Sequence, residues 1–170
     1  MDIFDLREDI NLNILKRSIS LDQSISLILS ELSVFFEDLK PDIVFVQGDT
    51  ITAFAGALAA FLKSIPVAHI EAGLRTENIY SPFPEEANRR MISQLTRLHF
   101  SPTKIAYENL INNGINKDVF ISGNTVVDAL NLVSKKINDF NIKNIDIYKE
   151  NYILTTVHRR ENWGHPISNI

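Results

Sequence analysis

The sequence lacks cysteine altogether, carries no excess of positive charge and contains no long apolar run. The missing cysteines exclude disulfides, thiolate metal sites and thiol nucleophiles. With 17 basic and 21 acidic residues, the formal net charge of −4 gives no reason to expect nucleic acid or an anionic membrane as a partner. No apolar run reaches the roughly 18 residues of a membrane span, and the acidic stretch after Met1 has no signal-peptide core. These absences predict a cytoplasmic protein.

Regular alternation of two patterns runs through the remaining sequence. Hydrophobic residues make up 45% of the chain, enough for a packed core. Apolar positions with helical spacing alternate with short apolar runs, several of which are bounded by Pro or Gly. Such alternation predicts an α/β fold with a Rossmann-like parallel sheet covered by helices on both faces. The expected strands are 43–47, 66–70, 98–101, 119–122 and 152–157, and the expected helices are 21–39, 52–63, 85–96, 104–112 and 125–138.

The polar stretch at residues 138–150 interrupts this alternation and is expected to be a linker. The strand expected at 152–157 then begins a second α/β unit, which is cut off at residue 170. We therefore expect an N-terminal Rossmann-like domain at 1–137, a linker at 138–150, and the start of a C-terminal Rossmann-like domain at 151–170.

Charged residues follow the expected strands at one edge of the sheet. In open α/β sheets, ligands bind beyond the carboxyl ends of the strands. Carboxylates follow the first two strands and begin the next helix, and an imidazole with two guanidinium groups follows the last strand. These candidates are Asp49, Glu71, Glu85, Glu86, His158, Arg159 and Arg160.

Several of these residues also have a purely structural interpretation. Asp49 or Thr50 is equally suited to cap the following helix. Glu85 and Glu86 suit a helix N-terminus, where the helix dipole favours negative charge. Glu71 has no such explanation, because it lies between an apolar strand and an Ala-Gly pair, where its carboxylate should be partly desolvated.

Other polar and aromatic residues favour structural roles. His69 is expected to be a hydrogen-bonded structural histidine, and Asn124 after Gly123 is expected to cap a helix. Three aromatic residues are expected to contribute packing rather than stacking surfaces for a ligand: Tyr80, Phe83 and Trp163.

Motifs of other chemistries are missing. The sequence has no G-x-G-x-x-G, no phosphate-binding P-loop and no G-x-S-x-G elbow, and its four histidines have no zinc-ligand spacing. What remains are carboxylates, which suit proton transfer or stabilisation of a cationic sugar, and a His-Arg-Arg cluster, which suits an anionic phosphate.

Six motifs in a fixed order carry a family resemblance. They are QGDT, HIEAGLRT, YSPFPEEANRR, HFSPT, GNTVVDAL and TTVHRREN, and the match around them extends over about residues 11–164. In order and spacing they resemble the non-hydrolysing UDP-N-acetylglucosamine 2-epimerases. The resemblance implies a two-domain glycosyltransferase-B-type fold with its active site between the domains. It also implies interconversion of UDP-N-acetylglucosamine and UDP-N-acetylmannosamine by elimination and re-addition of UDP, without a metal or nicotinamide cofactor.

The resemblance assigns roles to individual positions. Asp49, Glu71 and Glu85 match the catalytic carboxylates of the family. His158 matches a histidine that binds phosphate or acts as an acid, and with Arg159 it would contact the diphosphate. Asp49 and Glu71 would also bind the UDP-sugar. The full-length form is expected to be a homodimer.

Two departures from the family qualify this interpretation. The family's first strand and its glycine-threonine-arginine-proline loop have no counterpart before Met1, and the domain that binds uridine would follow the last residues of this chain. The chain thus resembles an internal half of an epimerase. Two alternatives stay open: an epimerase for a related diacetamido sugar nucleotide, and a truncated fragment without catalytic activity.

Overall fold

The computed structural model describes residue 4 and residues 6–14 and 19–136. The chain divides into two compact units, one made of residues 7–126 and the other of residues 1–6 and 127–170. The described elements are α1 (Leu21–Leu39), β1 (Val44–Gln47), α2 (Ile51–Leu62), β2 (Val67–Ile70), α3 (Glu85–Leu95), β3 (Leu98–Ser101), α4 (Lys104–Asn112), β4 (Val119–Ile121) and α5 (Thr125–Lys136). The linker and strand expected at 138–150 and 152–157 lie outside the described residues.

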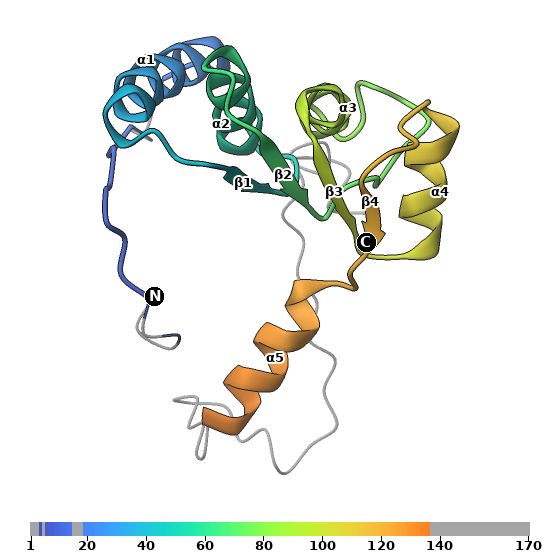
Figure 1. Cartoon of the computed structure of the whole chain (residues 1–170). Coiled ribbons are helices and arrows are strands. Elements are labelled where there is room, and N and C mark those ends of the chain that lie inside the picture. The colour runs from blue at the N-terminus through green and yellow to red at the C-terminus, as the bar shows by residue number, and fades with distance from the viewer. Residues whose placement is uncertain (1–3, 5, 15–18, 137–170) are drawn as a thin grey trace, which may run out of the picture. The chain divides into compact units, whose positions relative to one another are not determined.

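Four parallel strands form one sheet in the order β1-β2-β3-β4 (Figure 1). Val46 lies opposite His69, which lies opposite His99, so strand ends that are far apart in the sequence meet at one edge. Consecutive parallel strands joined by helices are the α/β arrangement that the alternating pattern predicts. The expectation of a parallel α/β sheet is confirmed.

Chain breakers place the elements within a residue or two of their expected bounds. Helix α1 begins after Ser20, whose hydroxyl accepts a hydrogen bond from the amide of Gln23 while the Gln23 side chain bonds back to Ser20, and it ends before Pro41. Thr50 caps α2 by accepting a hydrogen bond from Ala53 at 3.2 Å, which confirms one of the two capping alternatives.

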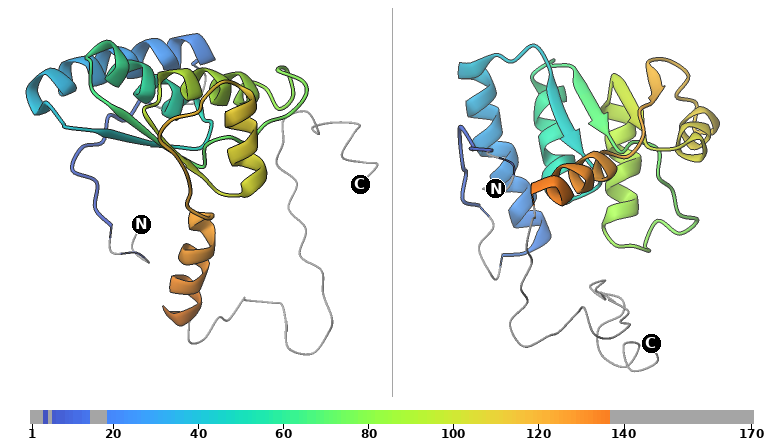
Figure 2. Two further views of the ribbon diagram at one scale, coloured as in Figure 1. Left: turned by 45° about the vertical axis from the view of Figure 1, so that its right-hand side comes forward. Right: turned by 90° about the horizontal axis from the view of Figure 1, so that it is seen from below.

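Helices α1, α2 and α3 lie on one face of the sheet (Figures 1 and 2). The core of this face forms where alanines of α2 meet Val46, Val67 and Ile92, with α1 packed outside α2. Small side chains allow this close approach: a Cβ placed on Gly56 would lie 3.5 Å from Cγ1 of Val46.

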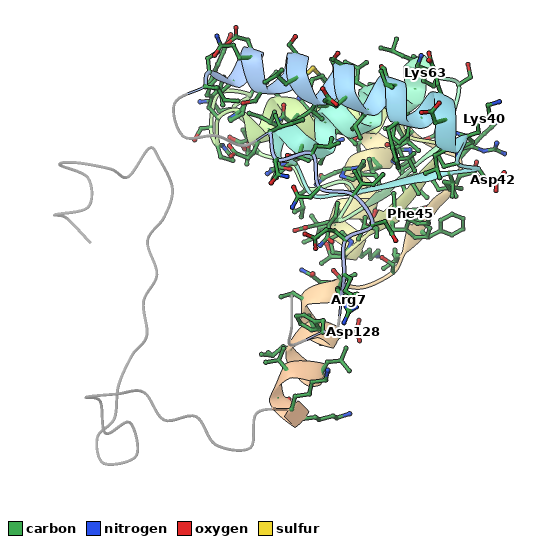
Figure 3. The ribbon with its side chains drawn as sticks, turned by 90° about the vertical axis from the view of Figure 1, so that its left-hand side faces the viewer. Arg7, Lys40, Asp42, Phe45, Lys63 and Asp128 are labelled. Atoms are coloured by element: carbon green, nitrogen blue, oxygen red, sulfur yellow. The ribbon has the colours of Figure 1, made fainter. Side chains whose placement is uncertain are left out.

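The opposite face of the sheet carries a row of phenylalanines. The ring centroids of Phe45 and Phe100 lie 6.5 Å apart, and those of Phe100 and Phe120 lie 5.7 Å apart. Phe45 is 58% exposed and projects on the side of β1 away from α1 (Figure 3). The expectation that both faces would be covered is therefore wrong for residues 7–126, since right-handed crossovers between consecutive strands place the connecting helices on the same side.

A close approach fixes the chain after β2. Gly73 has φ +90°, and a Cβ there would lie 2.1 Å from the carbonyl oxygen of Ala106 in α4. The Gly73 carbonyl also accepts a hydrogen bond from Asn109 at 3.0 Å. Only glycine fits this backbone conformation and this contact. Among the described helices, none combines the length and the apolar character needed to cross a membrane.

Candidate active site

Two turns meet at the carboxyl edge of the sheet, one after β1 and the other after β2. The amide of Gly48 donates to the carbonyl of Ile70 at 3.0 Å. Nε2 of His69 lies 2.8 Å from the carbonyl oxygen of Gly48, and because that oxygen only accepts, Nε2 carries the proton. His69 is fully buried, and burial lowers its pKa to about 4. The expectation of a structural, hydrogen-bonded histidine is confirmed.

Glu71 extends from the second turn toward the first. Its Oε2 lies 3.6 Å from the position that a Cβ on Gly48 would occupy. Desolvation raises the pKa of Glu71, the neighbouring charge of Asp49 raises it further, and the positive charge of Arg89 opposes both. The backbone of Glu71 has φ +68°, a left-handed conformation that is costly for a non-glycine residue. Two carboxylates and an unfavourable backbone angle thus lie together.

Side chains of α3 bind both the backbone and the carboxylate of Asp49. Nδ2 of Asn88 donates to the backbone carbonyl of Asp49 at 2.8 Å. Nε of Arg89 donates to Oδ2 of Asp49 at 3.1 Å, and Nη2 donates to the same oxygen. Nη1 of Arg89 reaches Oε2 of Glu86 at 3.1 Å. The guanidinium group therefore joins two carboxylates from different elements.

Glu86 closes the base of the loop between β2 and α3. It is completely buried, and its Oε2 accepts a hydrogen bond from the amide of Thr76 at 3.1 Å. Nε of Arg90 donates to Oε1 at 2.6 Å, and Nη2 of Arg90 donates to the carbonyl of Thr76 at 2.9 Å. The helix dipole explains an acidic residue at this position, but the hydrogen bonds show that Glu86 also ties the loop to α3.

Sequence reasoning missed Asn88 and Arg89. One feature of the sequence could have indicated Arg89. Glu86 and Arg89 lie one turn apart on the face of α3 that is buried, and two opposite charges at this i,i+3 spacing form an ion pair. In an amphipathic helix this buried face would be apolar.

The remaining predicted residues occupy different surroundings. Glu85 begins α3 at the same edge and is partly exposed, and its carboxylate has no hydrogen bond or ion pair with the described residues. Oδ1 of Asn124 accepts from the amide of Val126 at 3.1 Å, as a capping residue does. His158, Arg159, Arg160 and Trp163 lie outside the described residues.

The two aromatic residues of the loop depart from expectation. Tyr80 is 76% exposed and Phe83 is 53% exposed, so the expectation that they contribute packing is wrong for this part of the chain. The physical reason is the loop between Thr76 and Pro84, which runs over the surface where little else surrounds its side chains. Within the described residues, no group of three or more His, Asp or Glu side chains could hold a metal ion.

Relatives of known name match the whole chain. A family profile described as UDP-N-acetylglucosamine 2-epimerase matches residues 1–170. The chain is 47% identical to the UDP-N-acetylglucosamine 2-epimerase of Neisseria meningitidis and 46% identical to that of Bacillus subtilis. Each match covers 100% of this chain but only 48% and 45% of the relative, so the chain spans about half the length of the curated relatives it matches.

Solved structures give the same result. The N. meningitidis UDP-GlcNAc 2-epimerase bound to UDP-GlcNAc superposes with a TM-score of 0.77 at 50% identity, over 79% of this chain and 37% of that one. An S. aureus protein in a co-structure with UDP superposes with a TM-score of 0.87 at 38% identity, over 99% of this chain and 44% of that one. The match of the family profile to every residue, together with these relatives, shows that the chain belongs to the UDP-N-acetylglucosamine 2-epimerase family.

Proposed function

We propose that this chain is part of an enzyme that interconverts UDP-N-acetylglucosamine and UDP-N-acetylmannosamine. The observation that carries the proposal is the pair of carboxylates at adjacent strand ends, Asp49 and Glu71, with Glu71 half-buried in a left-handed backbone conformation. The substrate class is supported by the relatives, whose names specify this epimerase, and by the N. meningitidis structure bound to UDP-GlcNAc.

The reaction requires both an acid and a base near the sugar. The hydrogen on C2 is not adjacent to a carbonyl, so a base cannot remove it directly. When the bond between C1 and the UDP oxygen breaks, C1 becomes an oxocarbenium-like cation and the C2 hydrogen becomes acidic. Loss of that proton gives a glycal, and return of a proton to the opposite face of C2 with re-addition of UDP gives the epimer. The protein must move protons and stabilise charge at C1 and at the departing UDP.

Asp49 and Glu71 are suited to the two proton transfers. Desolvation and the charge of Asp49 raise the pKa of Glu71, which brings it closer to the range where a carboxyl group both accepts and returns a proton. Asp49 differs because Arg89 donates two hydrogen bonds to its Oδ2. Glu85, at the start of α3, would stabilise positive charge at C1.

The phosphate side of the reaction falls to residues outside the described part of the chain. In this proposal, His158 and Arg159 bind the diphosphate as it leaves, because cationic donors form strong hydrogen bonds to phosphate oxygens. Residues 151–170 would begin the second of two domains, and the full-length enzyme would be a homodimer.

Hydrogen exchange at C2 tests the carboxylate roles. In a full-length protein that contains residues 1–170, Glu71→Gln should slow the exchange of the C2 hydrogen with solvent deuterium by about 10²–10⁴-fold, the typical contribution of a positioned acid or base. Mass spectrometry of the UDP-sugars measures this exchange. Glu77→Gln is the matched control, because Glu77 is exposed in the loop that follows Glu71. Wild-type exchange in Glu71→Gln would exclude the assigned role.

A second substitution separates bond cleavage from proton transfer. His158→Ala should slow the appearance of free UDP and glycal, because the leaving diphosphate loses a hydrogen-bond donor. Chromatography of the reaction mixture measures both products. If UDP and glycal appear at the wild-type rate while C2 exchange is lost, His158 acts in proton transfer and the proposed division of roles is wrong.

A further inference from the structure

Arg89 is almost completely enclosed and uses three of its nitrogen atoms in ion pairs. The residue is 9% exposed, and Glu86 beside it is 0% exposed. Nε and Nη2 face Oδ2 of Asp49, and Nη1 faces Oε2 of Glu86. A guanidinium group holds such a fork in one plane, which a lysine ammonium cannot do. The orientation of the Asp49 carboxylate therefore depends on the placement of Arg89.

Glu86 is shared between this ion pair and the loop. The same Oε2 that meets Arg89 also accepts the amide of Thr76, while Oε1 accepts Arg90. A buried carboxylate with three donors is held in one position because leaving any donor unpaired is costly. The base of the loop, Glu86 and Arg89 thus form one connected network that ends on Asp49.

We propose that Arg89 is a positioning residue that fixes the Asp49 carboxylate beside Glu71, and that Glu86 transmits the placement of the loop base at Thr76 to Asp49 through Arg89. The inference rests on the proposed function, because Asp49 matters to catalysis only if the site acts on a sugar nucleotide. The inference adds a structural coupling to the proposed function. A change near Thr76, at the base of the loop, would alter the geometry of Asp49 and Glu71 without any contact to the substrate.

The decisive variant is Arg89→Lys in a full-length protein that contains residues 1–170. Lysine keeps the charge but cannot pair with both carboxylates in the same fork. We expect kcat to fall by about 10²-fold, the scale of a misplacement of about 1 Å, with KM changed by less than about 3-fold. Arg97→Lys is the matched control, because Arg97 is an exposed arginine between α3 and β3. A merely structural role would instead lower the amount of folded enzyme and leave kcat per folded molecule unchanged.

A pH profile separates the charge of Arg89 from its geometry. The groups that act on Glu71 are Asp49, which raises its pKa, and Arg89, which lowers it, in addition to burial. Arg89→Gln removes the charge that lowers the pKa of Glu71 and should move the limb of the kcat profile that belongs to Glu71 to higher pH. Arg89→Lys keeps that charge, so the limb should not move to higher pH, while the maximum should fall. If Arg89→Lys keeps the wild-type maximum while Arg89→Gln moves the limb to higher pH, Arg89 acts through its charge alone, and the positioning role is overturned.

Crystal structures of the variants decide the proposal independently of the reaction. In Arg89→Lys the Asp49 carboxylate should be displaced from its position beside Glu71 while α3 stays in place. If Arg89→Lys does not fold, Glu86→Gln tests the same network from its other end, with a displaced Arg89 as the expected result. An undisplaced Asp49 in the folded variant, or unchanged kcat, overturns the proposal. If the wild-type protein epimerises no UDP-sugar, the proposed function fails, and the position of Asp49 in the variant still decides the inference.

Discussion

Helices α2 and α3 are neighbours on the same face of the sheet, yet their buried sides are chemically opposite. The buried residues of α2 are five alanines and a glycine: Ala53, Ala55, Gly56, Ala57, Ala59 and Ala60. Those of α3 are one isoleucine and four polar residues: Glu86, Asn88, Arg89, Ile92 and Ser93. Apolar burial provides most of the folding free energy, whereas each buried polar group must find a partner to avoid a desolvation cost.

The polar interior of α3 makes sense only with its partners. Glu86 and Arg89 bond to the loop and to Asp49, and Ser93 accepts a hydrogen bond from Arg75 at 3.0 Å. The comparison shows that α2 holds the fold together, while α3 is built around the carboxylates that follow the strands. Three experiments test this division, in order of expected effect.

The largest effect should follow removal of Glu86. Glu86→Ala leaves Nη1 of the buried Arg89 and the amide of Thr76 without their acceptor, and it also removes the partner of the half-exposed Arg90. Breaking a buried ion pair in this way typically lowers the free energy of unfolding by about 3–5 kcal/mol. Urea denaturation of the full-length protein measures the loss. The exposed Glu77→Ala should change it by less than about 0.5 kcal/mol, and equal values for the two variants would contradict a structural role for the network.

The second largest effect should be a loss of stability in acid, through the buried histidines of β2 and β3. The ordinary pKa of histidine is 6.5, and burial lowers that of His69 to about 4. Above pH 6.5 the residue is neutral in both states, but between pH 6.5 and 4 only the unfolded chain binds the proton, so stability falls as the pH falls. The loss is up to about 3 kcal/mol from this residue, and His99, whose pKa burial also lowers, acts in the same direction.

Denaturation curves at several pH values between 4 and 7 measure this loss. The control is His69→Gln, whose amide can still donate to the carbonyl of Gly48 but does not titrate. The variant should lose part of the pH dependence. If its curve has the same slope as that of the wild type, the buried His69 does not carry the effect.

A larger side chain on the buried face of α2 should have the smallest effect on stability and should leave kcat unchanged. Ala57 is completely buried against the core, and Ala57→Leu adds volume where none is available. The expected loss is about 1–3 kcal/mol of unfolding free energy, with kcat of the folded enzyme unchanged. Thr52→Leu on the exposed side of α2 is the matched control. A large fall in kcat for Ala57→Leu would show that α2 also determines the geometry of the site.

The same contrast explains what could be predicted from the sequence. The bounds of α1, β3 and α4 follow from local signals, because prolines, glycines and capping residues act on their immediate neighbours. The strand-end rule brought Asp49 and Glu71 to one edge, and the structure places them together. Both predictions depend on short-range patterns and on a general topological rule.

The ion pair between Asp49 and Arg89 could not be predicted in this way. The two residues are 40 positions apart, and no local spacing connects them. The exposure of one sheet face among the described residues of 7–126 was also missed, since a short apolar run at 43–47 looks the same whether one or both faces of the strand are covered. Contacts that depend on the final arrangement of elements require the structure.

Glu71 and Gly73, which both follow β2, share a positive φ. In a mutational scan, substitutions at these two positions should be harmful for different reasons. At Gly73 any side chain collides with the backbone of α4, so every substitution should reduce the amount of folded protein in the cell. At Glu71 the left-handed backbone favours asparagine or glycine, so those substitutions should leave abundance equal or higher while removing activity. A screen for activity alone would score both positions as intolerant. A separate measurement of abundance would distinguish Gly73, which the fold requires, from Glu71, which the proposed chemistry requires.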